Sequence, residues 1–285
     1  MITVTTVAEL RVLLDAHRGN GHSVGFVPTM GYLHDGHASL MRAARVENDV
    51  VVTSIFVNPL QFAEDEDLSD YPRDLERDLQ VCDEAGADVI FAPTADEMYS
   101  RPMSTVVEVP EMAKRWEGAS RPTHFAGVAT VVAKLFSIVG TCSAYFGEKD
   151  FQQLRIITTM VEDLSFPIRV VGCPIRREDD GLAMSSRNIY LEGDQRAAAT
   201  VLNRALRAAI GAFHNGETDG AVLSQLMASE VTAEPLAALD YAAVVRSDDL
   251  TTARTVDDTN RLIIAADVGA TRLIDNMGLG STTPL

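Results

Sequence analysis

The chain has 285 residues, 46% of them hydrophobic and 23% charged, which is enough for about two domains with apolar cores. Its formal net charge of −17 argues against a nucleic-acid-binding protein, because phosphate backbones are bound by basic surfaces. No apolar run reaches the ~20 residues that cross a bilayer, and we expect no secretory signal. Three widely spaced cysteines, Cys82, Cys142 and Cys173, indicate reduced core thiols in a cytoplasmic protein.

Strand and helix patterns alternate through the first part of the chain. Thr6 and Glu9 form a capping box that begins a first helix. The apolar patterns predict strands at residues 23–28, 50–57, 89–92, 144–146 and 168–171, and helices from residue 36 and over 73–85, 128–139 and 151–164. Such alternation predicts an α/β fold with a parallel sheet covered by helices, and such sheets bind ligands at the carboxyl ends of their strands.

The pattern changes after about residue 175. Residues 194–214 and 222–231 read as helices, and residues 239–245 and 262–268 read as strands. We therefore predict a domain over residues 1–175 and a smaller α+β domain over residues 176–285. The tail after Met277 is expected to be frayed.

The first candidate motif runs from Pro28 to His37, between a predicted strand and a predicted helix. Backbone N–H groups at a helix start favour anions, and Gly31 and Gly36 permit a close approach to a phosphate. His34 and His37, three residues apart, can both donate to one phosphate group. The alternative is a pair of surface histidines, while a zinc site lacks a further ligand.

Two more motifs follow predicted strands. Asn58 and Gln61 carry uncharged amides that suit the binding of a hydroxy acid, although Asn58-Pro59 is also typical of a simple turn. Lys149, in the segment from Gly147 to Gln153, can neutralise phosphate charge. Asp150 can accept from ribose hydroxyls, or it simply caps the next helix.

The fourth motif, residues 180–188, places Ser185, Ser186 and Arg187 in one short loop. Two hydroxyls and a guanidinium make a phosphate clamp, and an ordinary interdomain loop is the alternative. An acidic cluster, Glu64–Asp67 with Asp70, is typical of a solvated loop, and its position beside Gln61 suggests a mobile lid over the site.

Taken together and in this order, the four motifs resemble the family of pantoate–β-alanine ligases (pantothenate synthetases). The segment with Gly118, Arg121-Pro122 and His124-Phe125-x-Gly127-Val128 also resembles that family. The resemblance implies a Rossmann-like nucleotidyltransferase domain, related to class I aminoacyl-tRNA synthetases through the histidine motif. It also implies a smaller domain that closes over the site, and a homodimer.

The activity implied by the resemblance is ligation of (R)-pantoate to β-alanine, with ATP and Mg²⁺, through pantoyl adenylate. His37, His34, Lys149 and Arg187 are then the catalytic residues. Pantoate is held by Asn58, Gln61, Arg121 and Gln153, and Asp78 is a candidate magnesium ligand. The residues implied to contact ATP are Met30, Gly31, Tyr32, Leu33, His34, Asp35, Gly36, His37, Gly147, Glu148, Lys149, Asp150, Arg176, Met184, Ser185, Ser186 and Arg187.

Without the family resemblance, the motif residues are compatible with other functions. A nucleotidyltransferase of the same fold would adenylylate a phosphorylated cofactor precursor and keep the nucleotide in its product. A non-catalytic nucleotide sensor could dispense with several of the motif residues, and the acidic balance disfavours a tRNA-binding synthetase.

Overall fold

The structure is a computed structural model that describes residues 1–63 and 68–280. The described chain forms two compact units: the first is Met1–Glu148 with Gln152–Pro174, and the second is Lys149–Phe151 with the chain from Ile175 onward. The division into folding domains at residue 175 stays a prediction, because compactness does not show independent folding. The predicted lid residues Glu64–Asp67 lie outside the described residues.

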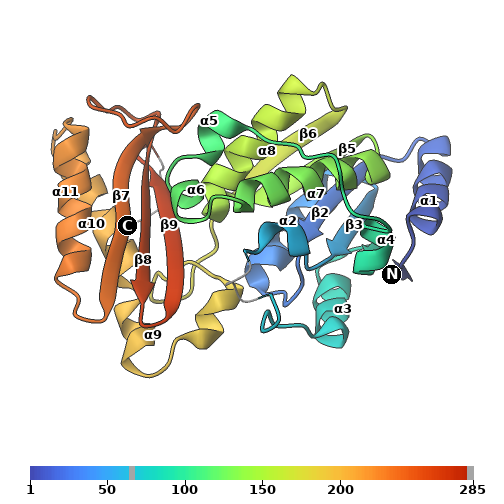
Figure 1. Ribbon diagram of the computed structural model, residues 1–285, viewed down its shortest axis with the longest axis horizontal. Helices are drawn as coiled ribbons and strands as arrows, with labels where there is room; N and C mark the ends of the chain where they lie inside the picture. Colours follow the sequence, from blue (N-terminus) through green and yellow to red (C-terminus); the bar gives the residue numbers. More distant parts are fainter. Residues whose placement is uncertain (64–67, 281–285) are drawn as a thin grey trace. The chain divides into compact units, whose positions relative to one another are not determined.

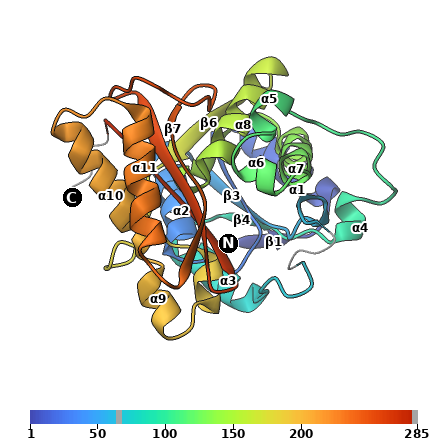
Figure 2. The ribbon, with the colours of Figure 1, turned by 60° about the vertical axis from the view of Figure 1, so that its left-hand side comes forward.

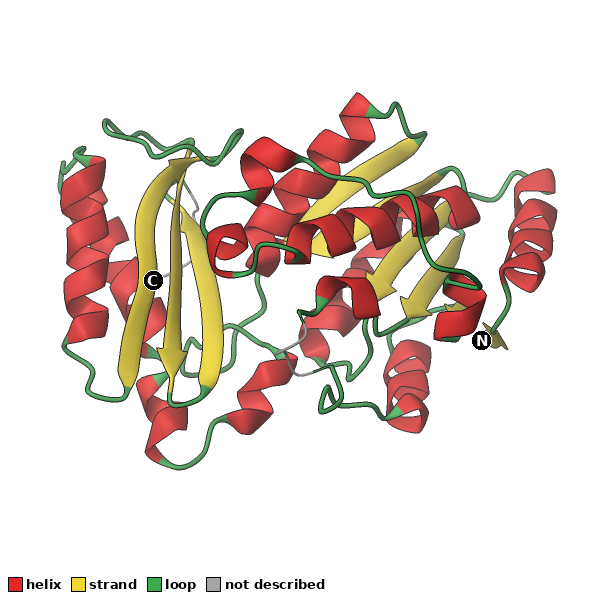
Figure 3. Ribbon diagram, viewed as in Figure 1, coloured by secondary structure: helices red, strands yellow, loops and turns green. Residues whose placement is uncertain are grey.

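The first unit contains a six-stranded, entirely parallel sheet, as the alternating pattern predicts (Figures 1 and 3). Its strand order is β1-β4-β3-β2-β5-β6, so the order reverses beside β2. A strand such as β3 is buried on both faces, which explains its continuous β-branched sequence. The strands are β1 (Ile2–Val4), β2 (Val24–Thr29), β3 (Val50–Ile55), β4 (Val89–Phe91), β5 (Cys142–Gly147) and β6 (Ile168–Cys173).

Helices cover both faces of this sheet. Because parallel connections are right-handed, the reversal of strand order places α2 and α3 on one face and α1, α7 and α8 on the other. The helices of this part are α1 (Val7–Gly19), α2 (Asp35–Glu47), α3 (Leu75–Glu84), α4 (Ala95–Met98), α5 (Pro110–Ala113), α6 (Glu117–Ser120), α7 (His124–Val139) and α8 (Phe151–Asp163), with the 3₁₀ turns η1 (Pro59–Gln61) and η2 (Glu148–Asp150). The capping box of Thr6 and Glu9 is confirmed. The sequence did not indicate β1, α4, α5 or α6.

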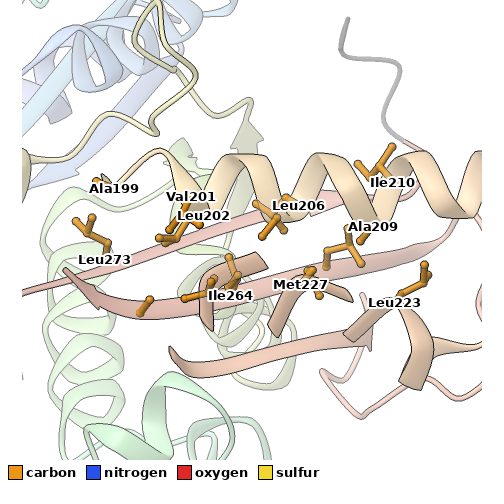
Figure 4. Close-up of a cluster of buried hydrophobic side chains, with 14 of the residues drawn as sticks. Ala199, Val201, Leu202, Leu206, Ala209, Ile210, Leu223, Met227, Ile264 and Leu273 are labelled. Atoms are coloured by element: carbon orange, nitrogen blue, oxygen red, sulfur yellow. The ribbon is translucent and has the colours of Figure 1, made fainter. Parts of the chain in front are cut away.

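The second unit packs two helices on an antiparallel sheet of order β7-β8-β9 (Figure 2). Leu206 and Ile210 of one helix, Leu223 and Met227 of the other, and Ile264 of the sheet form its fully apolar centre (Figure 4). The elements are η3 (Ser186–Tyr190), α9 (Asp194–Ala198), α10 (Val201–His214), α11 (Gly220–Thr232), β7 (Ala237–Arg246), β8 (Asn260–Val268) and β9 (Thr271–Gly278). This is the smaller α+β fold predicted for the end of the chain.

Two predictions for the second unit are wrong. The expected single helix over residues 194–214 is interrupted between α9 and α10. There the Thr200 hydroxyl donates to the Ala197 carbonyl, and such side-chain bonds compete with the helix ladder. The tail after Met277 is not frayed at Gly278 or Leu279, since β9 includes Gly278 and Leu279 is fully buried. Residues 281–285 lie outside the described chain.

Among the helices of the described residues, none combines the length and the apolar character that a membrane-crossing segment needs.

Candidate active site

The loop between β2 and α2 carries the first motif. Thr29 ends β2, and His34 is the N-cap residue of α2. The Gly36 N–H donates to His34 Nδ1 at 3.1 Å, and the His34 N–H donates to His37 Nδ1 at 3.3 Å. The two rings lie side by side, with centroids 4.1 Å apart. The imidazoles therefore cap their own helix as well as standing at its amino end.

These hydrogen bonds set the tautomer of both imidazoles. A nitrogen that accepts a backbone N–H carries no proton, so a neutral ring must hold its proton on the other nitrogen. His34 and His37 therefore each carry an Nε2–H donor beside the start of α2. Two neighbouring donors at a helix N-terminus suit the binding of phosphate oxygens.

Asp78, on α3, holds the same loop in place. Its carboxylate is buried and accepts from the Tyr32 N–H at 2.8 Å and the Leu33 N–H at 2.6 Å. Tyr32 has a positive φ of 50°, which costs a non-glycine residue free energy. Gly31 has φ 86°, and a Cβ there would lie 2.8 Å from Asp78 Oδ2. The absence of a Cβ at Gly31 therefore allows a close approach to Asp78, and an approach of Gly31 to a phosphate stays a prediction.

The predicted role of Asp78 as a magnesium ligand is poorly matched by this arrangement. Burial raises the pKa of the Asp78 carboxyl, against the opposing effect of the hydrogen bonds from Leu33 and Tyr32. Within residues 1–63 and 68–280, no group of three or more His, Cys, Asp or Glu side chains could hold a metal ion. Asp78 therefore supports the loop that carries the histidines, and the described side chains offer no preformed cluster for a metal ion.

The second motif follows β3 and forms a buried amide network. Tyr99 Oη and the Leu60 N–H both donate to Asn58 Oδ1, at 2.7 and 3.3 Å. Asn58 Nδ2 consequently faces Gln61 Oε1 at 3.3 Å, and Gln61 Nε2 contacts Met30 Sδ at 2.7 Å. Both amide orientations are therefore fixed, and Gln61 is linked to the loop that carries the histidines.

The start of α7 closes around this network. Asn58 Nδ2 also donates to the Gly127 carbonyl, while His124 Nδ1 lies 2.9 Å from the Gln61 carbonyl. A Cβ at Gly127 would lie 2.0 Å from the Leu60 carbonyl oxygen, so only glycine allows this approach. Arg121 Nη2 reaches the Gln61 carbonyl at 3.5 Å. Three of the four predicted pantoate residues, Asn58, Gln61 and Arg121, are therefore neighbours.

The third motif is shared between the two units. Gly147 ends β5, next to β2 in the sheet, and Glu148 also belongs to the first unit. Lys149 and Asp150 belong to the second unit, and Lys149 Nζ lies 3.7 Å from Asp150 Oδ1. Gln153, the fourth predicted pantoate residue, is half-buried near the start of α8. The adjacent β2 and β5 ends form the switch point at which such sheets bind ligands.

The fourth motif follows a tight hairpin in the second unit. Arg177 and Ala183 pair across it, and the Met184 N–H donates to the Arg176 carbonyl at 2.9 Å. Ser185 caps η3 by accepting the Arg187 N–H at 3.3 Å. The loop from Met184 to Arg187 is therefore held by a backbone hydrogen bond at Met184 and by the Ser185 side-chain cap, and Arg176 is exposed at the base of the hairpin.

Several contacts that support these motifs carried no recognisable signal in the sequence. Tyr99 fixes the Asn58 amide, and Gln152 binds the Met112 and Arg115 carbonyls and the Glu117 N–H. Asn276 of β9 donates to the Lys149 carbonyl at 2.8 Å. All act through contacts between distant parts of the chain, so no local motif announces them.

The three cysteines take no part in the site. All are free and buried, as predicted. Burial raises the pKa of Cys82 and of Cys142 to about 12 and that of Cys173 to about 11. They are therefore unreactive thiols at neutral pH.

Comparisons of the whole chain agree on one family. The family model described as pantoate-beta-alanine ligase matches residues 2–278. The pantothenate synthetase of Sinorhizobium medicae is 53% identical over 277 residues, covering 97% of this chain and 95% of the relative. That of Brucella canis is 51% identical over 287 residues, covering 100% and 97%.

Solved structures give the same result. The pantothenate synthetase of Thermus thermophilus matches with a TM-score of 0.93 and 48% identity, covering 98% of this chain and 99% of that one. The pantoate-beta-alanine ligase of Francisella tularensis, in complex with beta-gamma ATP and beta-alanine, matches with a TM-score of 0.80 and 33% identity, covering 99% and 98%.

Proposed function

Because the chain belongs to the pantoate–β-alanine ligase family, we propose that it condenses (R)-pantoate with β-alanine to pantothenate, through pantoyl adenylate. ATP supplies the AMP of the intermediate, pyrophosphate leaves in the first step, and AMP leaves in the second. The ATP and β-alanine named for the Francisella tularensis structure support this choice of ligands. The observation in this chain that carries the proposal is the pair of Nε2–H donors at the start of α2, on the same loop whose Met30 contacts the amide of Gln61.

The chemistry requires the negative charges of two reactants to be offset. The pantoate carboxylate attacks the α-phosphorus of ATP, and both groups are anionic. In the proposal, the Nε2–H groups of His34 and His37 donate to phosphate oxygens, and the ammonium of Lys149 lies against the phosphate chain. Such preorganised donors stabilise charge that develops in the transition state.

The remaining predicted ATP contacts complete the proposal. Asp150 binds the ribose, and Arg176 lies on the adenine side. The other residues proposed to contact the nucleotide are Met30, Gly31, Tyr32, Leu33, Asp35, Gly36, Gly147 and Glu148. The loop from Met184 to Arg187 clamps the phosphates, and the smaller domain closes over the site. Mg²⁺ accompanies ATP and supplies further charge neutralisation when bound.

The pantoate pocket of the proposal rests on the amide network. Asn58 and Arg121 hold Gln61, and Gln61 presents its amide to the hydroxyl and carboxylate groups of pantoate. Gln153 contributes from the start of α8. Because neutral amides both donate and accept, they orient a hydroxy acid without adding charge.

A two-stage assay tests the proposed function. Enzyme, ATP, Mg²⁺ and pantoate should release pyrophosphate in an amount close to that of the enzyme, without free AMP. Addition of β-alanine should then release AMP and pantothenate in equal amounts. Pyrophosphate release that needs β-alanine from the start would contradict the adenylate, and a product that keeps the nucleotide would favour the alternative nucleotidyltransferase.

We also expect two further properties of the protein, its oligomeric state and its location in the cell. A homodimer is expected, and light scattering coupled to size-exclusion chromatography measures it directly. A cytoplasmic location is expected as well, and fractionation of cells that produce the protein tests it.

A further inference from the structure

Two polar residues of β9 are buried in an otherwise apolar part of the second unit. Asp275 is 4% exposed and Asn276 is 2% exposed, beside strand residues such as Ile264 and Leu273. Burying a carboxylate and an amide is costly unless both are fully hydrogen-bonded. Their partners therefore show what these two residues stabilise.

The side chain of Asn276 binds the segment that contains Lys149. Its Nδ2 donates to the Lys149 carbonyl at 2.8 Å, and its Oδ1 accepts from the guanidinium of Arg261. The same guanidinium lies over the ring of Phe151, 3.9 Å from its centroid. Residues 149–151 are thus attached to β8 and β9 on both sides of Asp150.

Asp275 binds the hairpin that precedes the loop Met184–Arg187. Its carboxylate pairs in bidentate fashion with Arg177, at 2.7 Å from Nη1 and 3.0 Å from Nη2. The side chains are 2% and 16% exposed, so the pair is shielded from water. Arg177 also donates to the Gly181 carbonyl at 3.0 Å and to the Asn276 carbonyl at 3.4 Å.

The two sets of contacts meet on neighbouring residues of one strand. The Asn276 N–H donates to Asp275 Oδ1 at 2.7 Å, and Arg177 binds both the Asp275 carboxylate and the Asn276 backbone. A shift of this part of β9 would move the Lys149 segment and the hairpin together. Strand β9 therefore acts as a common support for two segments that are far apart in the sequence.

We propose that Asn276 and the Asp275–Arg177 pair are positioning residues, which fix the Lys149 segment and the loop Met184–Arg187 in register for the phosphates of ATP. The inference rests on the proposed function, in which both segments bind ATP. In this proposal, Asn276 and Asp275 act on the substrate only through the segments that they hold. Their effect is on geometry, and a displacement of about 1 Å at a reacting group costs on the order of 10²-fold in rate.

The test compares four variants in the pantoate-dependent release of pyrophosphate. Asn276→Asp keeps the size of the side chain and an acceptor for Arg261 but removes the donor to the Lys149 carbonyl. It should lower kcat by roughly 10- to 100-fold while leaving the KM for pantoate within about 3-fold. Arg272→Ala, which removes a partly exposed ion pair between β9 and Asp240, is the matched control and should keep near wild-type activity.

The other two variants are Lys149→Ala and the double variant Lys149→Ala/Asn276→Asp. If Asn276 acts through Lys149, the second substitution should lower the rate of Lys149→Ala by less than about 2-fold. If the double variant instead loses rate by the product of the two single-variant factors, the inference is overturned, because Asn276 then acts independently of Lys149. Wild-type activity of Asn276→Asp would overturn it as well.

The two proposals fail in different ways. Lys149→Ala with normal pyrophosphate release would contradict the proposed role of Lys149, whatever Asn276 does. An impaired Lys149→Ala beside an active Asn276→Asp would contradict only the positioning role.

If Asn276→Asp does not fold, amide hydrogen exchange of the wild-type protein tests the inference instead. ATP and pantoate together should slow exchange in residues 149–151 and 176–188 by similar factors. Protection of only one of the two segments would overturn the inference.

Discussion

Buried hydrogen bonds determine how the polar side chains of the first unit are oriented. Asn58 and Gln61 have fixed amides because Tyr99 and a backbone N–H occupy the Asn58 oxygen. His34 and His37 have fixed tautomers because backbone N–H groups occupy their Nδ1 atoms. These groups are therefore oriented before any ligand arrives, which lowers the free energy needed to organise them on binding.

Gln61→Ala should weaken the binding of pantoate more than that of ATP. The substitution removes a preoriented amide worth about 1–2 kcal/mol, or roughly 5- to 30-fold in the KM for pantoate. The KM for ATP should change by less than about 3-fold. Steady-state kinetics with each substrate varied measure both constants, and Gln225→Ala, on an exposed surface of α11, is the control. The opposite ordering of the two effects would contradict the assignment of the pantoate pocket.

Asp78→Asn tests whether Asp78 supports the histidine loop or binds a metal ion. The amide of asparagine can accept from only one of the Tyr32 and Leu33 N–H groups, so one buried donor loses its partner. We expect a loss of about 1–3 kcal/mol in the free energy of unfolding, measured in urea, and a lower kcat. Asp83→Asn, exposed on the same helix, should have little effect. Unchanged stability with a raised Mg²⁺ requirement would instead indicate a metal ligand.

At the scale of secondary-structure elements, close packing decides which segments meet at the amide network. The first turn of α7 contacts η1 so closely that the backbone of Gly127 touches the Leu60 carbonyl. The interruption between α9 and α10, where the Thr200 hydroxyl donates to the Ala197 carbonyl, shows that a continuous helical pattern in the sequence does not fix where a helix ends. Hydrophobic periodicity predicts the helices, and single residues decide their ends and contacts.

Gly127→Ala should destabilise the protein and disturb the pantoate pocket. The added Cβ would lie 2.0 Å from the Leu60 carbonyl oxygen, so α7 and η1 must separate. We expect a loss of about 1–3 kcal/mol in the free energy of unfolding and a higher KM for pantoate.

Gly211→Ala in α10 is the matched control, because a Cβ there has no neighbour within 4 Å. It should stabilise the protein by up to about 1 kcal/mol through the higher helix propensity of alanine. Equal effects of the two substitutions on thermal unfolding would contradict the close approach at Gly127.

For the molecule as a whole, exposed carboxylates link stability to pH. The backbone N–H and then the hydroxyl of Ser23 lower the pKa of Asp49, Arg196 lowers the pKa of Asp180, and the Thr259 hydroxyl lowers the pKa of Asp257. A carboxyl whose pKa is lower in the folded state stabilises the fold above the unfolded pKa. That stabilisation is lost as the pH falls through the folded pKa. The raised pKa of Asp78 acts in the opposite direction.

We therefore expect stability to be steady near neutral pH and to decline below about pH 4, where unfolded carboxyls begin to bind protons that the folded groups do not. Urea unfolding midpoints at constant ionic strength measure this dependence. Stability that rises steadily down to about pH 2.5 would show that the carboxylates with lowered pKa do not dominate.

Much of the fold and of the candidate site followed from local sequence. Alternating apolar periods predicted the parallel sheet of the first unit and the α+β character of the second. Three of the four motifs contain a residue that caps the next helical segment, namely His34, Asn58 and Ser185, and such caps leave a local signal in the sequence. The family resemblance rested on these same motifs, and the comparisons confirmed it.

The residues that hold the motifs in place were decided only by the tertiary structure. Asp78 lies 46 positions from Tyr32, and Asn276 lies 127 positions from Lys149, so no local period or motif relates them. The close approach between Gly127 and the Leu60 carbonyl has the same origin. Periodicity records which face of an element is buried, because that depends on neighbouring residues. The partner of a buried polar group is set by the tertiary fold, which brings distant segments together. No short stretch of the sequence indicates which distant residue that partner is.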